Sequence, residues 1–223
     1  MSLDPETRHD RDWLVTKESD AFFEQALRYP DIAQVTSRLQ PKRLLDVGCG
    51  SGYLAKLLKE GVPGLVVHGV DISSVALERA RHHVDQVWQV DLDKNDLPVS
   101  SEQYDTVTCI EVLEHLYDPD HAIGEIARVL ASGGCAVVTV PNLAYWRYRL
   151  DLLRGRVPPP AIDPRHLHQF DQRLLAKALG RSDLRLTGMT GHAVRLPWLA
   201  RRHPAVFSDI LIATAVKASQ DHP

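Results

Sequence analysis

A glycine-rich turn between two regular elements constrains this chain more than any other feature. Gly48, Gly50 and Gly52 alternate directly after an apolar run at 44–47 and directly before a stretch with helical spacing. Glycine adopts positive φ and has no Cβ, so the backbone of such a turn can come close to a ligand. The helix behind it begins with unpaired N–H groups. The pattern therefore predicts a nucleotide-type cradle at the end of a buried strand.

The same succession of apolar strand, turn and helix repeats along the chain, and it predicts an α/β fold. Short, nearly continuous apolar strands that alternate with helices favour a parallel sheet covered by helices on both faces. Strands are expected at 43–48, 65–71, 87–92, 104–112, 135–141, 184–191 and 208–218, and helices at 51–61, 73–83, 120–131 and 171–180, with a basic loop at 194–204.

Two regions lie outside this alternation. Residues 1–40 are expected to form a polar segment followed by helices that cap the ligand site, with Pro30 dividing the helical part in two. The main domain is expected over 41–223. It contains an aromatic, basic and proline-rich insert at about 142–170, and ligands of open α/β sheets lie outside the carboxyl ends of the strands, where this insert begins. We expect a substrate lid there; the alternative is an ordinary amphipathic helix with its aromatic side chains on the core.

Acidic residues at the ends of three predicted strands indicate the ligand. The turn has the spacing GxGxG, one residue tighter than the dinucleotide fingerprint, and Asp46 beside it would repel a phosphate but accept from an ammonium group. Asp71 follows the turn at the distance where a carboxylate can accept the hydroxyls of a ribose. Asp91 ends the third strand, within reach of an adenine edge. The expected ligand is an adenosine whose other half carries a positive amine.

Five motifs in order resemble the class I S-adenosylmethionine-dependent methyltransferases. They are LLDVGCGSG, VDIS, VDL, IEVLEHL and an SGG before a strand, and the resemblance covers roughly residues 40–217. The ExxEH stretch after the fourth strand is similar to that of small ubiquinone-biosynthesis-type O-methyltransferases. The resemblance implies S-adenosylmethionine as cofactor and a Rossmann-like seven-stranded sheet whose last strand runs antiparallel to the others.

The resemblance also implies which residues contact the cofactor. The glycines would pass under its methionine part, Ile72 would pack on the adenine, and Ile110 would line the floor near the sulfonium. The full implied set is Asp46, Gly48, Cys49, Gly50, Gly52, Asp71, Ile72, Asp91, Leu92, Ile110 and Glu111.

The ExxEH stretch is also the first candidate for catalysis. Glu111 and Glu114 share a face if this turn is helical, and His115 titrates near neutrality, which suits a base that removes a proton from a hydroxyl acceptor. Two alternatives stay open. The glutamates could simply favour the first turn of a helix, or Glu111, Glu114 and His115 could bind a divalent metal.

The segment DPRHLHQFD supplies a second candidate base. His166 and His168 are two residues apart, so in an extended segment they face opposite ways, and one of them can point into the cleft. Small-RNA ribose methyltransferases combine an ExxEH-type cluster with a later histidine, which keeps an RNA ribose 2′-hydroxyl as an alternative acceptor.

Composition narrows the partners. The net charge of −3 gives no overall basic footprint for nucleic acid, and no apolar run is long enough for a transmembrane helix. Cys49, Cys109 and Cys135 lie far apart in or beside apolar runs, which favours buried free thiols in a cytoplasmic protein. We expect an enzyme that methylates a small molecule at a hydroxyl, with contact to a membrane surface through the basic aromatic insert as an additional option. A methyltransferase-like binding protein without turnover is the alternative from a different class.

Overall fold

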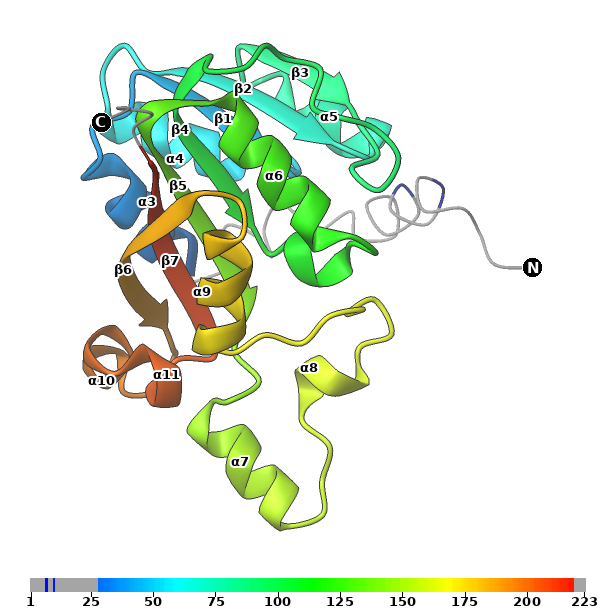
Figure 1. Cartoon of the computed structure of the whole chain (residues 1–223), viewed down its shortest axis with the longest axis vertical. Helices are drawn as coiled ribbons and strands as arrows, with labels where there is room; N and C mark the ends of the chain where they lie inside the picture. Colours follow the sequence, from blue (N-terminus) through cyan, green and yellow to red (C-terminus); the bar gives the residue numbers. More distant parts are fainter. Residues whose placement is uncertain (1–6, 8–9, 11–27, 219–223) are drawn as a thin grey trace.

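A single mixed sheet organises the chain. The computed structural model describes residue 7, residue 10 and residues 28–218, and within this part seven strands pair in the order β3-β2-β1-β4-β5-β7-β6 (Figure 1). Strands β1 to β5 pair in parallel, and β7 pairs antiparallel with both β5 and β6. This confirms the predicted parallel sheet with an antiparallel last strand. The strands are β1 (Arg43–Val47), β2 (Val66–Asp71), β3 (Gln86–Gln89), β4 (Tyr104–Ile110), β5 (Leu130–Pro141), β6 (Leu184–His192) and β7 (Ile210–Lys217).

Helices cover the sheet on both faces. Helices α3, α4 and α5 pack on one face, while α6 and α9 pack on the other (Figure 1). The insert and the connection from β6 to β7 form further short helices beyond the sheet. The helices are α3 (Arg28–Ser37), α4 (Tyr53–Gly61), α5 (Ser74–Ala80), the 3₁₀ helix η1 (Leu113–His115), α6 (Pro119–Val129), α7 (Trp146–Leu153), α8 (Pro159–Ile162), α9 (Gln172–Gly180), α10 (Pro197–Arg202) and α11 (Pro204–Phe207).

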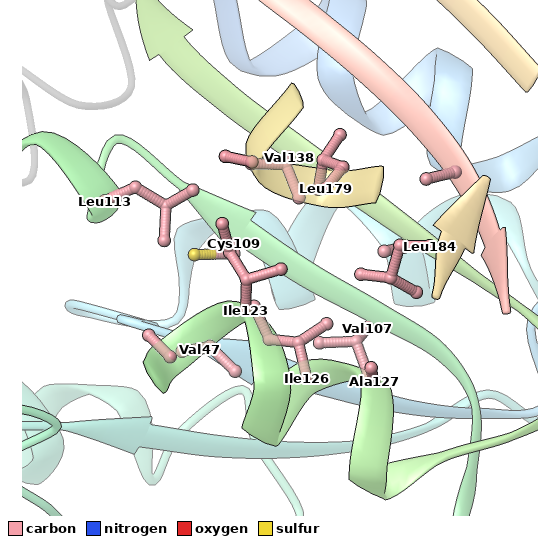
Figure 2. Close-up of a cluster of buried hydrophobic side chains, with 14 of the residues drawn as sticks. Val47, Val107, Cys109, Leu113, Ile123, Ile126, Ala127, Val138, Leu179 and Leu184 are labelled. Carbon is pink, nitrogen blue, oxygen red and sulfur yellow. The ribbon is translucent and has the colours of Figure 1, made fainter. Parts of the chain in front are cut away.

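Alternation of side chains along the central strands divides the core in two. Successive residues of a strand point to opposite faces of the sheet, so Leu44 packs with the α4 side and Leu45 with the α6 side. Figure 2 shows the larger cluster, in which Ile123 and Ile126 of α6 meet Val107 and Cys109 of β4. Because both faces of these strands are buried, the sequence reads as nearly continuous apolar runs.

Local capping explains where the helices begin. The Ser73 side chain accepts a hydrogen bond from the backbone N–H of Ala76 and so caps α5. The carboxylate of Asp171 likewise accepts from the N–H of Leu174 at the start of α9. These caps fix the ends of the elements that follow the strands.

Three local predictions were wrong. Pro30 does not divide the helix, because it lies in the first turn of α3, where a missing backbone N–H costs nothing; any helix before Arg28 lies outside the described residues. Helix α6 ends at Val129 rather than near residue 132, because Leu130 pairs with Tyr104 of β4 and starts β5. The predicted basic loop at 194–204 contains α10, which begins with Pro197.

No helix among the described residues is both long enough and apolar enough to cross a bilayer.

Candidate active site

The glycine turn after β1 has the positive φ values that its sequence predicts. Gly48, Gly50 and Gly52 have φ values of 74°, 52° and 79°. A Cβ added to Gly48 would stand 2.3 Å from Cγ2 of Val112, so the space beside this glycine is already taken by the loop after β4. The turn is therefore a glycine-only cradle at the carboxyl edge of the sheet, which fits a ligand that lies close to the backbone.

Asp71, at the end of β2, holds this cradle in place. Its Oδ2 accepts from the N–H of Gly50 at 2.9 Å, and its Oδ1 accepts from the N–H of Ser73 at 2.9 Å. A carboxylate offers about four lone-pair sites, so Asp71 can accept additional hydroxyl groups while it keeps both bonds. Its position fits the predicted ribose contact.

Asp10, in the N-terminal segment, contacts the chain near this point. The carboxylate of Asp10 accepts from the Ser73 hydroxyl at 2.5 Å and from the Ser74 hydroxyl at 3.1 Å. Asp10 is therefore placed beside the loop that follows Asp71. The remaining part of the predicted cap before Arg28 lies outside the described residues, apart from residue 7.

Asp46 is buried under the cradle rather than open to solvent. Its Oδ1 accepts from the Thr108 hydroxyl at 2.6 Å, across the parallel pair of β1 and β4. Burial raises the pKa of Asp46 to about 7; the Thr108 bond opposes this shift, and the nearby charge of Asp71 adds to it. The sequence analysis missed Thr108. Its only sequence signal is its position in a buried strand, three residues before Glu111.

The remaining predicted cofactor residues lie along the same edge. Asp91 forms an ion pair of 2.6 Å with Lys94, and Leu92 beside it is buried. Ile72 is half-buried, and both Ile110 and Cys49 are buried. Burial raises the pKa of the Cys49 thiol, which favours a packing role over reactivity at this position.

Glu111 leaves β4 with a backbone that non-glycine residues rarely adopt. Its φ is 55°, and its Oε1 accepts from the Thr139 hydroxyl at 3.0 Å. Burial raises the pKa of Glu111, and the guanidinium of Arg28 opposes that shift. Strained non-glycine residues concentrate at functional positions. The strain at Glu111 places a carboxylate directly after the end of β4.

Glu114 differs from Glu111 in that its carboxylate has no hydrogen bond within the described part of the chain. The side chain is 1% exposed, and neither oxygen has a partner. Its Oε1 lies 4.0 Å from Nε2 of His115. Burial, followed by the charge of Glu111, raises the pKa of Glu114 well above the ordinary range. A buried carboxylate without a donor is costly, so it marks a place where a proton or a cation belongs.

His166 joins this carboxylate from the far end of the insert. Glu114, His115 and His166 each offer one ligand atom, and these three atoms lie within 4.8 Å of one another. The rings of His115 and His166 have centroids 5.0 Å apart. The metal hypothesis named Glu111 in place of His166, but Glu111 bonds to Thr139 instead. We call Glu114, His115 and His166 the Glu-His-His cluster.

Backbone carbonyl groups fix the tautomers of both histidines. Nδ1 of His115 lies 3.0 Å from the carbonyl oxygen of Arg165, and Nδ1 of His166 lies 3.0 Å from that of Pro160. A carbonyl oxygen can only accept, so each Nδ1 must carry the hydrogen. In the neutral ring, Nε2 then carries the lone pair, which can take a proton or bind a metal ion.

The backbone of the insert is clamped to the ExxEH turn. The N–H groups of Leu167 and His168 both donate to the carbonyl oxygen of Glu114, at 2.7 and 3.1 Å. His168 itself turns away and contacts the carbonyl oxygen of Tyr117 through Nε2 at 3.3 Å. The two histidines, which were predicted to face opposite ways, contact the carbonyl groups of different residues, and His166 is the one that meets the cluster.

Two charged residues near Glu111 were missed by the sequence analysis. Nε of Arg28 and Oδ1 of Asp209 are both buried, and neither has a hydrogen-bond partner in the described structure. Burial raises the pKa of both Glu111 and Asp209, and the charge of Arg28 opposes that shift in each. Arg28 precedes the glycine turn by twenty residues and carries no motif of its own, so only the tertiary structure reveals it.

Comparison with known proteins places this arrangement in a family. Residues 23–187 match the family described as Methyltransferase domain. The ubiquinone biosynthesis O-methyltransferase of Alkalilimnicola ehrlichii is 32% identical over 178 residues, covering 74% of this chain and 69% of that protein. The enzyme of the same name from Vibrio atlanticus is 31% identical over 174 residues, covering 74% of this chain and 72% of that protein.

Solved structures agree on the fold. A methyltransferase from Thermotoga maritima superimposes with a TM-score of 0.69 at 18% identity, over 94% of this chain and 98% of that one. One from Archaeoglobus fulgidus gives 0.65 at 18% identity, over 86% and 93%. The family match and the curated relatives show that the chain belongs to the methyltransferase domain family, and it is an S-adenosylmethionine-dependent methyltransferase.

Proposed function

We propose that this enzyme methylates a hydroxyl group of a small-molecule acceptor. The Glu-His-His cluster is the observation that carries the proposal. S-adenosylmethionine supplies an electrophilic methyl group, and a hydroxyl becomes a good nucleophile only when its proton is removed or its oxygen is coordinated. An amine with a free lone pair needs neither. The name O-methyltransferase in both quoted relatives supports the same acceptor chemistry.

The cofactor would lie along the carboxyl edge of the sheet. In this proposal Asp71 accepts the ribose hydroxyls, and the buried Asp46 accepts from the ammonium group. Arg28 has a buried, unpartnered Nε, and it suits the carboxylate of the methionine part. Glu111 and Ile110 then face the reacting end, and Ile72, Asp91 and Leu92 surround the adenine.

The cluster can activate a hydroxyl in two ways. In the first, Nε2 of His115 or His166 takes the proton, and the buried carboxylate of Glu114 stabilises the imidazolium that forms. In the second, the three side chains hold a divalent ion, for which one carboxylate and two imidazoles are suitable ligands. We favour the proton acceptor, because histidine titrates in the range where an acceptor hydroxyl needs a base.

Turnover with and without a chelator separates the two mechanisms. The assay offers labelled S-adenosylmethionine with a panel of phenols, aliphatic alcohols, amines and carboxylic acids, and mass spectrometry locates the methyl group. We expect methyl ethers, a rate that rises with pH near neutrality, and a loss of about 10²–10⁴-fold in His115→Ala or His166→Ala. If a chelator abolished turnover and added metal restored it, a bound ion rather than a histidine base would activate the hydroxyl. Products methylated only on nitrogen would refute the hydroxyl proposal.

An RNA ribose is the second candidate acceptor. The later histidine of the cluster, His166, favours it, because this histidine completes the set that the sequence analysis associated with small-RNA enzymes. A labelled-methyl assay with short RNA and with the same RNA carrying 2′-deoxy ends distinguishes the two classes. Transfer to the ribose RNA alone would replace the small-molecule acceptor.

A further inference from the structure

We propose that the end of the molecule formed by α7, its following loop and α10 docks on an anionic lipid bilayer. The proposal goes beyond the methyl-transfer reaction and does not depend on the identity of the acceptor. It rests on exposed apolar side chains, on arginines that surround them, and on the fold that brings two distant segments to one end.

Helix α7 leaves large apolar side chains exposed at its C-terminal end. None of its eight residues is buried. Leu152 is 55% exposed, Leu153 is 83% exposed, and Val157 in the following loop is 57% exposed. In Figure 1 the helix stands away from the sheet at the lower end of the view. A helix packed only on its own domain would bury such leucines.

The connection between β6 and β7 repeats this composition. Val194 is 68% exposed, Leu196 is 43% exposed, and Trp198 in α10 is 63% exposed. Leu196 also has a φ of 57°, a conformation unfavourable for a bulky residue, at the N-cap of α10. The chain therefore maintains an irregular turn that presents apolar side chains to solvent.

The fold brings the two segments to the same end of the molecule. The insert follows the carboxyl end of β5, and α10 follows the carboxyl end of β6. Because β7 is antiparallel to both strands, β5 and β6 point the same way. Figure 1 shows α7, α8, α10 and α11 at this end, beyond the sheet. Of the twelve large apolar residues that are exposed in the described part of the chain, eight lie here: Leu150, Leu152, Leu153, Val157, Ile162, Val194, Leu196 and Trp198.

Arginines surround these apolar side chains. Residues 146–157 contain four arginines and one aspartate, and residues 194–203 contain three arginines and no acidic residue, in a chain whose net charge is −3. The exposed set is Arg147, Arg149, Arg154, Arg156, Arg195, Arg201 and Arg202, of which Arg201 is paired with Asp31 at 2.8 Å. Positive charge is thus concentrated at the end that exposes leucine and tryptophan.

This combination favours a lipid surface over a nucleic acid. Interfacial segments insert apolar side chains between headgroups while basic residues contact anionic lipids. Tryptophan prefers the same depth. A phosphate backbone would satisfy the arginines but would leave Leu153 and Trp198 in water. A bilayer accounts for both the arginines and the exposed apolar residues. Docking in this way would place the carboxyl edge of the sheet close to the membrane.

Vesicle sedimentation tests the proposal on the full chain. We expect binding to phosphatidylcholine vesicles that contain phosphatidylglycerol, little binding to phosphatidylcholine alone, and release at high salt. Each basic residue near an anionic surface strengthens binding about fivefold. Arg154→Glu with Arg156→Glu should therefore weaken binding at least tenfold, and Leu152→Ser with Leu153→Ser or Trp198→Ser should also weaken it.

Matched controls lie at the opposite edge of the sheet. Arg185→Glu, at the start of β6, and Val66→Ser, at the start of β2, change an exposed arginine and an exposed valine there, and both should bind vesicles like the unchanged chain. All variants should keep their circular dichroism and their affinity for S-adenosylhomocysteine. Three results would each overturn the proposal. The first is vesicle binding that the surface variants leave unchanged, and the second is a dimer that Leu153→Ser abolishes. The third is RNA that binds the same arginines more tightly than vesicles do.

Discussion

The ring of His115 lies 5.0 Å from the ring of His166, centroid to centroid, with 54° between the ring planes. His115 belongs to η1 after β4 and His166 to the far end of the insert, and two backbone hydrogen bonds from the insert to the carbonyl oxygen of Glu114 keep the two segments together. The insert is therefore part of the candidate active site and supplies one of its titratable groups. Its helices α7 and α8 lie farther out, so one segment contributes both to the cluster and to the proposed membrane surface.

Replacement of the unpartnered carboxylate should stabilise the protein and inactivate it. Glu114→Gln removes a charge that burial disfavours, so we expect a higher melting temperature at pH 8, where unfolded glutamate is ionised. Turnover should fall at least a hundredfold, since a neutral amide cannot stabilise an imidazolium or bind a cation well.

The matched control for this change is a buried glutamate with partners. Glu125 accepts from the N–H of Leu97 and pairs with Arg128, so Glu125→Gln should lower the free energy of unfolding by about 1.5–3 kcal/mol and leave turnover intact. A Glu114→Gln variant that loses stability and keeps its turnover would contradict the role of the cluster.

The buried Asp46 should make the unliganded protein less stable as the pH rises. Its folded pKa of about 7 lies above its ordinary value of 3.8. Such an acid contributes its full stability below the ordinary value and loses that contribution as the pH rises through the folded pKa. Asp46→Asn keeps an acceptor for Thr108 and cannot ionise. Thermal unfolding should therefore show the variant gaining stability relative to the wild type between about pH 4 and pH 7, the range between the two pKa values. A constant difference across that range would refute the shift.

Asp71 should control affinity for the cofactor. Asp71→Ala removes a proposed acceptor for the ribose and the bond that holds Gly50, so calorimetry should show S-adenosylhomocysteine binding weakened by about 1.5–3 kcal/mol. Asp85 provides the control, because its carboxylate accepts from the N–H of Val67 at the opposite end of β2. Equal losses in Asp71→Ala and Asp85→Ala would point to a general effect on folding.

Replacement of Gly48 by alanine should destabilise the protein more than the same change at a glycine that has a similar φ and open space around its added Cβ. Gly133 has a φ of 73° and nothing within 4 Å of an added Cβ, whereas a Cβ at Gly48 would meet Val112 at 2.3 Å. Gly48→Ala should therefore cost about 1–3 kcal/mol more in the free energy of unfolding than Gly133→Ala. Chemical denaturation measures both. Val112→Ala should recover part of the difference in the double variant, and no recovery would rule out this contact as the cause.

The glycine spacing and the strand ends were readable from the sequence because they obey local rules. Gly48, Gly50 and Gly52 need positive φ wherever they occur, and Asp46 and Asp71 follow apolar runs that can only be buried strands. Local signals failed at Leu130, where strand pairing ended α6 earlier than its helical pattern suggested. They also failed at Pro197, where a basic segment formed a helix.

The sequence by itself determined the family, the order of the strands along the chain and the glycine turn after β1, because each depends on contiguous motifs. Only the tertiary structure decided which groups meet. It buried Asp46 in a hydrogen bond with Thr108, and it paired Glu111 with the hydroxyl of Thr139. It also brought His166, rather than Glu111, next to Glu114 and His115. It also placed α7 and α10 at one end. These pairings join residues far apart in the chain, and they depend on sheet register and on loop clamps that no local pattern encodes.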